Sequence, residues 1–392
     1  MRQIAILSLV FDNYGTRLQS YALCKALHRI CGDEAHVEVV NVETPWGNQK
    51  NISKKQLLIN AFKEYGVYGF PYIYRTFKWK YERRIAQRSA SEELEHKRSK
   101  LFELLNEKIP YTSRLFTMDD IRKGALSDYD TLIVGSDQVW NGIRVPDQDV
   151  FLLDFAKHQK CLTYAASFGM SKMPPHISHV YEKGLKNFSS LLIREDEGVK
   201  ICKKLGRTDA KRVLDPTLLL CYEDYLEIID DSVPQIGGKY ILVYSLNRSY
   251  GIYDETYKLC KRLGYKMVVL RRSFVPPVNM EKYKDTVDLF AVSPGGFLSL
   301  IKNAECVLTN SFHALIFSIN FNTPFYLYLD RADLENSRLI TMAKMCHLEN
   351  RIYWEMQSLP KSIGEIDYTE SNRILSNERD KSITLLKESL GL

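Results

Sequence analysis

Within its 392 residues, the chain has no apolar stretch that approaches the roughly 18 uncharged residues needed for a membrane-spanning helix. The first apolar segment, IAILSLVF, is followed by Asp12 and Asn13 and not by a small-residue cleavage site. We therefore expect a buried strand there and no signal peptide.

Paired cysteines are missing as well. The eight cysteines are scattered along the chain, and no two of them form a CxxC pair. This pattern argues against a disulfide framework and against a zinc site. It favours reduced thiols, most of them core residues, in a cytoplasmic protein.

A strong charge imbalance is also absent, since the formal net charge is +6. No basic RNA-binding signature occurs, and we expect no nucleic-acid partner. A mild positive charge permits an anionic substrate or an anionic membrane surface. With 45% hydrophobic and 26% charged residues, the composition is that of a globular protein.

The length of the chain makes two domains of roughly 150 to 200 residues the default. Strands alternate with helices in both halves, which predicts parallel α/β sheets. We place an N-terminal α/β domain at residues 1–212, with a helical, tyrosine-rich insertion at about 46–116. A C-terminal α/β domain follows at 213–365 and a terminal helix at 366–392. Two such domains facing each other would form a cleft, a common place for a ligand.

Residues 293–330 predict helix, strand, turn, helix and strand in succession. A short buried strand is expected at residues 306–308, and polar residues end it. The next helix is apolar on all sides and is expected to be packed between a sheet and other helices. His313 lies where this strand ends and the helix begins. Because ligands of open α/β sheets bind beyond the carboxyl ends of strands, His313 is the first candidate functional residue.

The N-terminal segment predicts a strand, a turn at Asn13, Tyr14 and Gly15, and then a helix. A second strand is expected at residues 36–43. Gly15 would allow a substrate to approach the backbone closely. An ordinary βα turn explains the same glycine equally well, because one glycine is far weaker than a GxGxxG motif.

The α/β rhythm resumes in DTLIVGSDQVWN, which starts with a buried strand. Asp137, Gln138 and Asn141 would then point into the strand-end cleft, and Trp140 would be available to stack on a sugar ring. Local backbone capping is the commoner role of an aspartate in a turn. Both interpretations of Asp137 stay open.

Two arginines occupy positions that suit an anion. Arg194 follows an apolar strand and precedes a helix whose first turn is acidic. Such an arginine either forms an ion pair or presents its planar fork to a phosphate or carboxylate. Arg338 lies at the start of a later helix and is a candidate to reach into the cleft.

Within the insertion, residues 63–88 combine many aromatic residues with basic ones, among them Arg75, Lys78, Lys80, Arg83 and Arg84. The plainest interpretation is a helical insertion that packs its tyrosines on the domain. A second interpretation is a basic, aromatic face at a membrane interface. A third is an aromatic platform for a sugar or a nucleic-acid base.

Several segments together resemble the polysaccharide pyruvyl transferase family. They are, in order, NYGTRLQSYAL, IVGSDQVWN, IREDEG, VLDPTLLL and TNSFHALIFS followed by TPFY. The resemblance implies two Rossmann-like domains facing a cleft, similar to the GT-B glycosyltransferases. The implied reaction moves an enolpyruvyl unit from phosphoenolpyruvate to two hydroxyls of a sugar. Its product is a pyruvate ketal on a surface polysaccharide, such as an exopolysaccharide or capsule, or on a lipid-linked precursor.

The resemblance places the family's histidine at His313 and its strand-end arginine at Arg194. Many members have Arg-Leu-His where this chain has Ser311, Phe312 and His313. A donor-site arginine is therefore missing at position 311. Arg338, or a basic residue at 248, 271 or 272, is a candidate to replace its charge. Ala314 likewise stands where glycine is usual.

From this resemblance we assign hypothetical roles. His313 acts as the general acid, Arg194 and Arg338 hold the donor anion beside Ser311 and Phe312, and Asp137 orients or deprotonates the sugar hydroxyl. The expected acceptor-binding residues are Asn13, Tyr14, Gly15, Gln138, Trp140 and Asn141. We expect no required metal and no cofactor besides the phosphoenolpyruvate donor.

Two alternatives are kept. One is a GT-B-type glycosyltransferase that uses a nucleotide-sugar in surface glycan synthesis. The other is a non-catalytic glycan-binding protein in a membrane-associated assembly. For the pyruvyltransferase we expect a cytoplasmic location, with peripheral contact at the inner face of the plasma membrane if the acceptor is lipid-linked.

Overall fold

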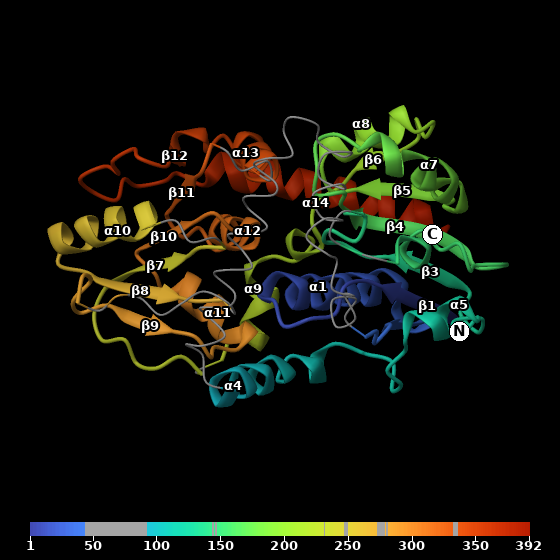
Figure 1. Ribbon diagram of the computed structural model, residues 1–392, viewed down its shortest axis with the longest axis horizontal. Coiled ribbons are helices and arrows are strands. Elements are labelled where there is room, and N and C mark those ends of the chain that lie inside the picture. The colour runs from blue at the N-terminus through green and yellow to red at the C-terminus, as the bar shows by residue number, and fades with distance from the viewer. Residues whose placement is uncertain are drawn as a thin grey trace, which may run out of the picture. The chain divides into compact units, whose positions relative to one another are not determined.

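The computed structural model describes residues 1–43, 92–142, 145, 147–230, 232–246, 250–272, 279, 281–331 and 336–392. They form two compact α/β units, each built on a six-stranded parallel sheet (Figure 1). Most of the tyrosine-rich insertion lies outside the described residues, and so do Arg75, Lys78, Lys80, Arg83 and Arg84. No helix in the described ranges is both long and apolar enough to cross a bilayer.

The described parts of the first unit are residues 1–43, Asn106–Leu219 and Arg379–Leu392. The second unit contains residues 92–105 and the described part of Leu220–Glu378. The change between these units lies between Leu219 and Leu220. The terminal helix is divided between the two units.

The first sheet has the strand order β2-β1-β3-β4-β5-β6, and all its neighbouring strands are parallel. Every residue of β3 is buried, and so is every residue of β4 after Lys160, as expected where helices cover both faces of a parallel sheet. The strands are β1 (Arg2–Leu7), β2 (Ala35–Val39), β3 (Thr131–Val134), β4 (Lys160–Ala166), β5 (Ser190–Ile193) and β6 (Lys211–Arg212).

The helices of the first unit follow its strands. They are α1 (Tyr14–Cys31), α5 (Met118–Arg122), α6 (Gln148–Phe151), α7 (Pro175–Gly184), α8 (Asp196–Lys204) and the last part of α14 (Thr369–Leu390). The end of α14 packs on β5, where the hydroxyls of Ser389 and Ser190 lie 2.7 Å apart. Short 3₁₀ turns occur at Gly32–Glu34, Asn106–Lys108, Leu185–Asn187 and Pro216–Leu218.

The second sheet has the order β12-β11-β10-β7-β8-β9 and is likewise parallel throughout. β7, β10 and β11 are buried at every position and form its centre. The strands are β7 (Tyr240–Tyr244), β8 (Lys266–Leu270), β9 (Val287–Leu289), β10 (Cys306–Thr309), β11 (Phe325–Leu329) and β12 (Ile352–Trp354).

The helices of the second unit include one from the insertion, α4. They are α4 (Glu92–Glu103), α9 (Tyr222–Tyr225), α10 (Tyr250–Leu263), α11 (Pro294–Lys302), α12 (Phe312–Asn320), α13 (Asn336–Met345) and the first part of α14. Leu226–Ile228 and Glu349–Arg351 are 3₁₀ turns. α12 buries nearly all of its residues, which confirms the helix expected to be apolar on all sides.

The predicted fold class is confirmed. The expected order of helix, strand, turn, helix and strand after residue 293 corresponds to α11, β10, the turn before α12, α12 and β11. These elements form because short, fully buried apolar runs suit central parallel strands, and polar residues end each run.

Candidate functional site

Each sheet contains one point at which its strand order reverses. In the first unit the chain passes from β1 to β2 on one side and then returns to β3 on the other. In the second unit it runs through β7, β8 and β9 and then returns to β10 beside β7. Ligands of open parallel sheets bind beyond the carboxyl ends of the strands at such switch points. The β1/β3 and β7/β10 edges are therefore the two candidate ligand edges.

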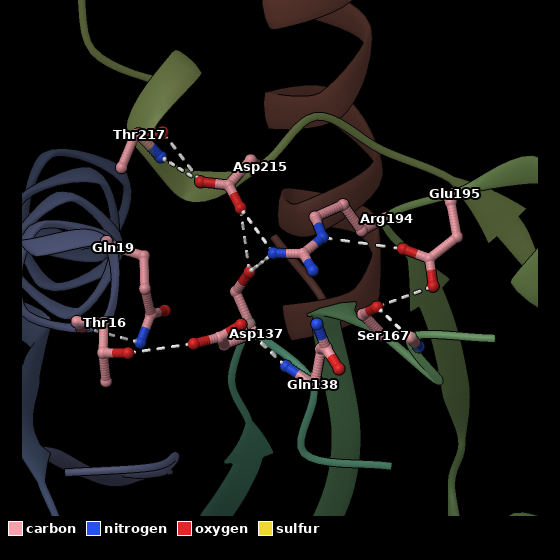
Figure 2. A network of polar contacts seen from close by, with 12 residues as sticks. Thr16, Gln19, Asp137, Gln138, Ser167, Arg194, Glu195, Asp215 and Thr217 are labelled. Atoms are coloured by element: carbon pink, nitrogen blue, oxygen red, sulfur yellow. Dashed lines mark hydrogen bonds and ion pairs between the residues drawn. The ribbon is translucent and has the colours of Figure 1, made fainter. Parts of the chain in front are cut away.

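Asp137 lies at the first switch point, just after β3. The hydroxyl of Thr16, on α1, donates a 2.9 Å hydrogen bond to Oδ2 of Asp137 (Figure 2). The backbone N–H of Gln138 donates to Oδ1 at 2.9 Å. The φ angle of Asp137 is +72°, a left-handed conformation that L-residues adopt at a cost. The half-buried carboxylate thus both caps its turn and is held at the ligand edge.

Arg194 lies in a buried ion-pair network on the same edge (Figure 2). Its Nη1 donates to Oδ2 of Asp215 at 3.0 Å, and its Nε lies 3.5 Å from Oε2 of Glu195. The Arg194 side chain is only 2% exposed. The anion-holding role predicted for Arg194 does not fit this geometry, because two carboxylates already face its single positive charge. The ion-pair interpretation, also drawn from the sequence, is the one that fits.

The partners of Arg194 connect it to neighbouring strand ends. Asp215 accepts a 2.7 Å hydrogen bond from the Thr217 hydroxyl, and Glu195 accepts one of the same length from the Ser167 hydroxyl. Ser167 follows β4, and Asp215 follows β6. Arg194 therefore fixes the loops after β4, β5 and β6 relative to one another.

The expected acceptor residues at the start of α1 cap the helix. The Asn13 side chain accepts from the backbone N–H groups of Gly15 and Thr16, at 2.9 and 3.4 Å. Tyr14 is 1% exposed, and Gly15 is also buried. The turn is thus an ordinary N-cap in this structure, and its Gly15 N–H is already used internally.

Gln138 and Asn141 form a side-chain amide pair, with Nδ2 of Asn141 donating to Oε1 of Gln138 at 2.8 Å. Gly169 allows this pair to form, because a Cβ atom on Gly169 would lie 2.3 Å from Oε1 of Gln138. The two amides were predicted together from the sequence, and the structure brings them together. Gly169, from the loop after β4, was not predicted.

Trp140 requires a correction. It was expected to stack on a sugar ring, but it has no exposed surface. Its Nε1 donates to the carbonyl oxygen of Phe151 at 2.9 Å, and its ring packs against Phe168 and Phe188 with centroids 5.2 and 5.4 Å apart. Trp140 is a core residue beneath the turn that contains Asp137.

His313 lies at the second switch point, as the second residue of α12. Ser311 caps this helix and accepts a long hydrogen bond of 3.5 Å from the N–H of Ala314. The preceding turn is fixed by Thr309, which donates to the carbonyl of Tyr244 at 2.6 Å and accepts from the N–H of Ser311 at 2.9 Å. His313 itself is half-buried. It lies in the first turn of α12, where the free backbone N–H groups of a helix favour anions.

Phe312 lies beside His313, and Arg338 lies beside Phe312. The rings of Phe312 and His313 have centroids 5.6 Å apart, and the Arg338 guanidinium lies 5.8 Å from the centre of the Phe312 ring. Arg338 is the third residue of α13 and is half-buried. His313, Phe312, Ser311 and Arg338 therefore belong to one edge of the second unit.

Three further arginines belong to the second unit: Arg271 and Arg272 directly follow β8, and Arg98 comes from α4. Arg272, after β8, donates to the carbonyl oxygen of Leu246 at 3.0 Å, while the Leu246 N–H donates to Oδ1 of Asn310 at 2.7 Å. This chain of contacts leads from Arg272 to the turn that precedes His313. Arg271 and Arg98 lie further along the same edge. Arg271 and Arg272 were predicted as replacements for the missing arginine; Arg98, on α4, was not.

The described residues contain no group of three or more histidine, cysteine, aspartate or glutamate side chains that could hold a metal ion.

The sequence signal for Arg98 was weak. Arg98 and Phe102 are the buried residues of α4 and are spaced by four, within an otherwise charged helix.

Several solved structures resemble the whole chain at low sequence identity. The UDP-GlcNAc 2-epimerase of Neisseria meningitidis, solved with UDP-GlcNAc, has a TM-score of 0.51 and 7% identity, covering 100% of this chain and 99% of its own. The epimerase of Rickettsia bellii has a TM-score of 0.48 and 9% identity, covering 99% and 96%. ADP-heptose lps heptosyltransferase II of E. coli has a TM-score of 0.42 and 10% identity, covering 97% and 99%. At such identities the likeness concerns the fold alone, which is GT-B-like.

No curated protein sequence matches the chain. A family model does match it, over residues 13–330, and its description is polysaccharide pyruvyl transferase. The matched range starts at the Asn13 cap and includes Asp137 and His313. Because the match covers most of the chain, the protein belongs to the polysaccharide pyruvyl transferase family.

Proposed function

We propose that this protein transfers a pyruvyl group from phosphoenolpyruvate to two hydroxyls of one sugar, forming a pyruvate ketal. The observation that carries the proposal is the position of His313. It lies at the switch point of the second sheet, at the start of a helix, next to Phe312, whose ring is also near the Arg338 guanidinium. A histidine there can exchange a proton with a bound anionic donor.

Phosphoenolpyruvate carries a carboxylate and a phosphate, and both need positive partners. The start of α12 offers N–H groups; Arg338 lies near Phe312, and Arg272 is linked through Leu246 to Asn310 in the turn before α12. These two arginines supply the charge that Ser311 does not. Arg194 acts in this proposal as a positioning residue, because its contacts are with buried carboxylates.

The reaction balances without a redox partner. A proton from His313 is added to the methylene carbon of phosphoenolpyruvate, and positive character develops at the neighbouring carbon. One sugar hydroxyl attacks that carbon and loses its proton to a base. Phosphate then leaves, taking the electron pair of its C–O bond, and the second hydroxyl attacks and loses its proton. The products are a pyruvate ketal and inorganic phosphate; of the two protons lost by the hydroxyls, one restores His313 and the other is taken up by the departing phosphate.

Asp137 is the proposed base or orienting group for the acceptor. Its carboxylate is held by Thr16 and by the Gln138 N–H, and the Gln138–Asn141 amide pair lies next to it. Carboxylates and amides are suitable partners for sugar hydroxyls.

The proposed acceptor is a sugar of a cell-surface polysaccharide or of its lipid-linked precursor. A lipid-linked acceptor would place the enzyme at the inner face of the plasma membrane. The insertion would then contact anionic lipid through Arg75, Lys78, Lys80, Arg83 and Arg84. Replacing these five residues by glutamine should weaken binding to phosphatidylserine vesicles, and unchanged binding would return the insertion to a packing role.

The test of the function is turnover. The purified chain is incubated with phosphoenolpyruvate and a panel of pyranosides, and phosphate release and the acid-labile ketal are measured. His313→Asn should lower kcat by at least about 100-fold, the lower range for a general acid. His176→Asn, which changes an exposed histidine of α7, should not.

A parallel thermal-shift titration compares phosphoenolpyruvate with UDP and CMP, since a ligand that binds the native state stabilises it. Stabilisation by phosphoenolpyruvate supports the proposal. Stabilisation by a nucleotide alone, together with transfer from a nucleotide-sugar, would replace it with the glycosyltransferase alternative. If His313→Asn kept the parental kcat, His313 would not be the general acid.

A further inference from the structure

Strand β4 contains one residue whose backbone is unusual for a strand. Ala165 has a φ of +56°, in the left-handed region, and it has no exposed surface. This region is uncommon for an alanine, because the Cβ atom comes too close to the following carbonyl oxygen. Such a conformation persists only where the surrounding structure holds it, and it occurs most often at functional sites.

The pairing of β4 with β5 shows how Ala165 is used. Between Tyr164 and Ala166, β4 advances by two residues, while β5 advances by one, from Leu192 to Ile193. Ala165 is the extra residue of a β-bulge, a feature that is rare between parallel strands. Bulges are frequent next to active sites, where they redirect the strand.

On its other side, β4 stays in step with β3. Val134 pairs with Thr163, and three residues later on both strands Asp137 pairs with Ala166. The extra residue therefore lets β4 follow β3 as far as Asp137, although β5 is one residue shorter over this stretch. Without the bulge, the same pairing with β5 would bring Ala166 opposite Ser136.

Beyond the bulge, β4 holds the Asp137 turn through Ser167. The Ser167 N–H donates to the carbonyl oxygen of Asp137 at 3.0 Å, and the Ser167 carbonyl oxygen accepts from the N–H of Trp140 at 3.1 Å. The Ser167 hydroxyl is itself fixed by its hydrogen bond to Glu195 (Figure 2). A side chain follows its own backbone, so the direction of the Asp137 carboxylate depends on Ser167 as well as on Thr16.

We propose that Ala165 is a positioning residue of the acceptor site. Its left-handed bulge places the Ser167 N–H opposite the Asp137 carbonyl oxygen and so fixes the direction in which the Asp137 carboxylate meets a sugar hydroxyl. The role of Asp137 in this inference rests on the proposed function. Ala165 acts only through Asp137, since it has no exposed surface with which to contact a substrate.

The variants test the left-handed conformation at position 165. Valine is β-branched and disfavours a positive φ strongly, so Ala165→Val should displace the bulge. Glycine adopts a positive φ without steric cost, so Ala165→Gly should keep it. The control is Leu153→Val, because Leu153 is also buried and left-handed, with a φ of +57°, but lies in the turn after α6.

The kinetic measurement varies phosphoenolpyruvate and the acceptor separately. Ala165→Val should lower kcat for ketal formation at least about tenfold, a part of the roughly 100-fold or more that a well-placed acid or base provides. The KM for phosphoenolpyruvate should change less than about twofold, because the proposed donor residues belong to the second unit. Ala165→Gly should keep kcat within about twofold of the parent. Leu153→Val should lower the thermal midpoint and keep the parental kcat.

Amide hydrogen exchange tests the same contact without turnover. The Ser167 amide should exchange at least about tenfold faster in Ala165→Val than in the parent, and at the parental rate in Ala165→Gly. If Ala165→Val does not fold, Ser167 is replaced by its α-hydroxy acid, whose ester linkage lacks the N–H that donates to Asp137. This ester variant should lower kcat by about 2- to 10-fold, the range for one hydrogen bond.

Parental kcat in folded Ala165→Val, or in the ester variant, would overturn the positioning role. An equal fall of kcat in Leu153→Val would also overturn it, because the effect would then be a general loss of stability. If the parent forms no ketal, the proposed function fails, and exchange of the Ser167 amide still decides whether the bulge holds the Asp137 turn. Ketal formation that Ala165→Val leaves unchanged would keep the function and remove the positioning role.

Discussion

The Thr16 hydroxyl and the Asp137 carboxylate are joined by a 2.9 Å hydrogen bond although 121 positions separate them in the sequence. The bond links the helix that follows β1 to the turn that follows β3, and it crosses the switch point of the first sheet. The orientation of the Asp137 carboxylate is therefore fixed by α1 as well as by its own turn.

Replacing Thr16 by valine tests this relationship. Thr16→Val keeps the shape of the side chain but removes its hydroxyl. Oδ2 of Asp137 would then lose the hydrogen bond that holds it in place. The expected result is a fall in kcat of about 2- to 10-fold, the equivalent of about 0.5–1.5 kcal/mol for one hydrogen bond. Steady-state kinetics with varied acceptor would measure it. Thr16→Ser keeps the hydroxyl and should keep the rate; equal rates for both variants would argue against an orienting role.

The Arg194 network predicts a stability effect. Arg194→Met should lower the free energy of unfolding by about 3–5 kcal/mol, because Asp215 and Glu195 would remain buried beside an uncharged side chain. Urea denaturation measures the loss. The control is Arg212→Met, whose ion pair with Asp196 is partly exposed and should be worth about 0–1 kcal/mol. Weaker phosphoenolpyruvate binding at unchanged stability would instead restore the anion-holding role.

A side chain at position 169 should disturb the Gln138–Asn141 amide pair by steric clash. Gly169→Ala combines a left-handed φ of +62° with a Cβ atom 2.3 Å from Oε1 of Gln138. We expect a loss of about 2–5 kcal/mol from strain and overpacking together. Gly206→Ala has a similar φ of +88° and open space around its Cβ, so it should lose only the strain of about 1–2 kcal/mol. Thermal unfolding of both variants gives the comparison, and equal losses would contradict the clash.

Arg122 predicts a pH-dependent contribution to stability. Its Nε and Nη2 donate to Asp149, and this hydrogen bonding is the largest cause of the lowered pKa of Asp149. A lowered folded pKa stabilises the protein above the unfolded value of about 3.9, and the effect is lost as the pH falls through the folded pKa. The Tm of the parent should therefore exceed that of Arg122→Gln at pH 6, and this difference should shrink below about pH 4. A constant gap would contradict this.

Thiol accessibility provides a further test of the core. All eight cysteines are free, and seven are buried while Cys221 is partly exposed. Burial raises the pKa of Cys24 to about 12 and that of Cys161 to about 11, so neither thiol should ionise near neutral pH. Ellman's reagent should label about one thiol in the native protein, and Cys221→Ser should abolish that labelling. Fast labelling of several thiols would show that the core opens.

Much of the fold could be predicted because parallel strands are buried on both faces. β3 and β10 therefore read as short, unbroken apolar runs that end in polar turns. The same logic located His313 and Asp137 at strand ends. What the sequence could not provide was the strand order, since the switch points depend on which strands become neighbours.

The errors at the site have a similar cause. Trp140 follows polar residues in a turn, and only the packing of Phe168 and Phe188 against it shows that it is core. Arg194 was surrounded by nearby acids in the sequence, yet Asp215, from the loop after β6, makes its shortest ion pair. Arg98 belongs to a helix whose charged residues suggest full solvation, and one buried pair spaced by four is a weak signal.

The two-unit division also has a consequence for synthesis on the ribosome. The first unit begins with β1 and is completed by Arg379–Leu392, whose Leu390 carbonyl accepts from Nη1 of Arg2 at 3.0 Å. The second unit is translated almost entirely between these segments. It can therefore begin to fold while the first still lacks the helix that packs on β5. We expect nascent chains stopped before Arg379 to protect the second sheet from proteolysis earlier than the first.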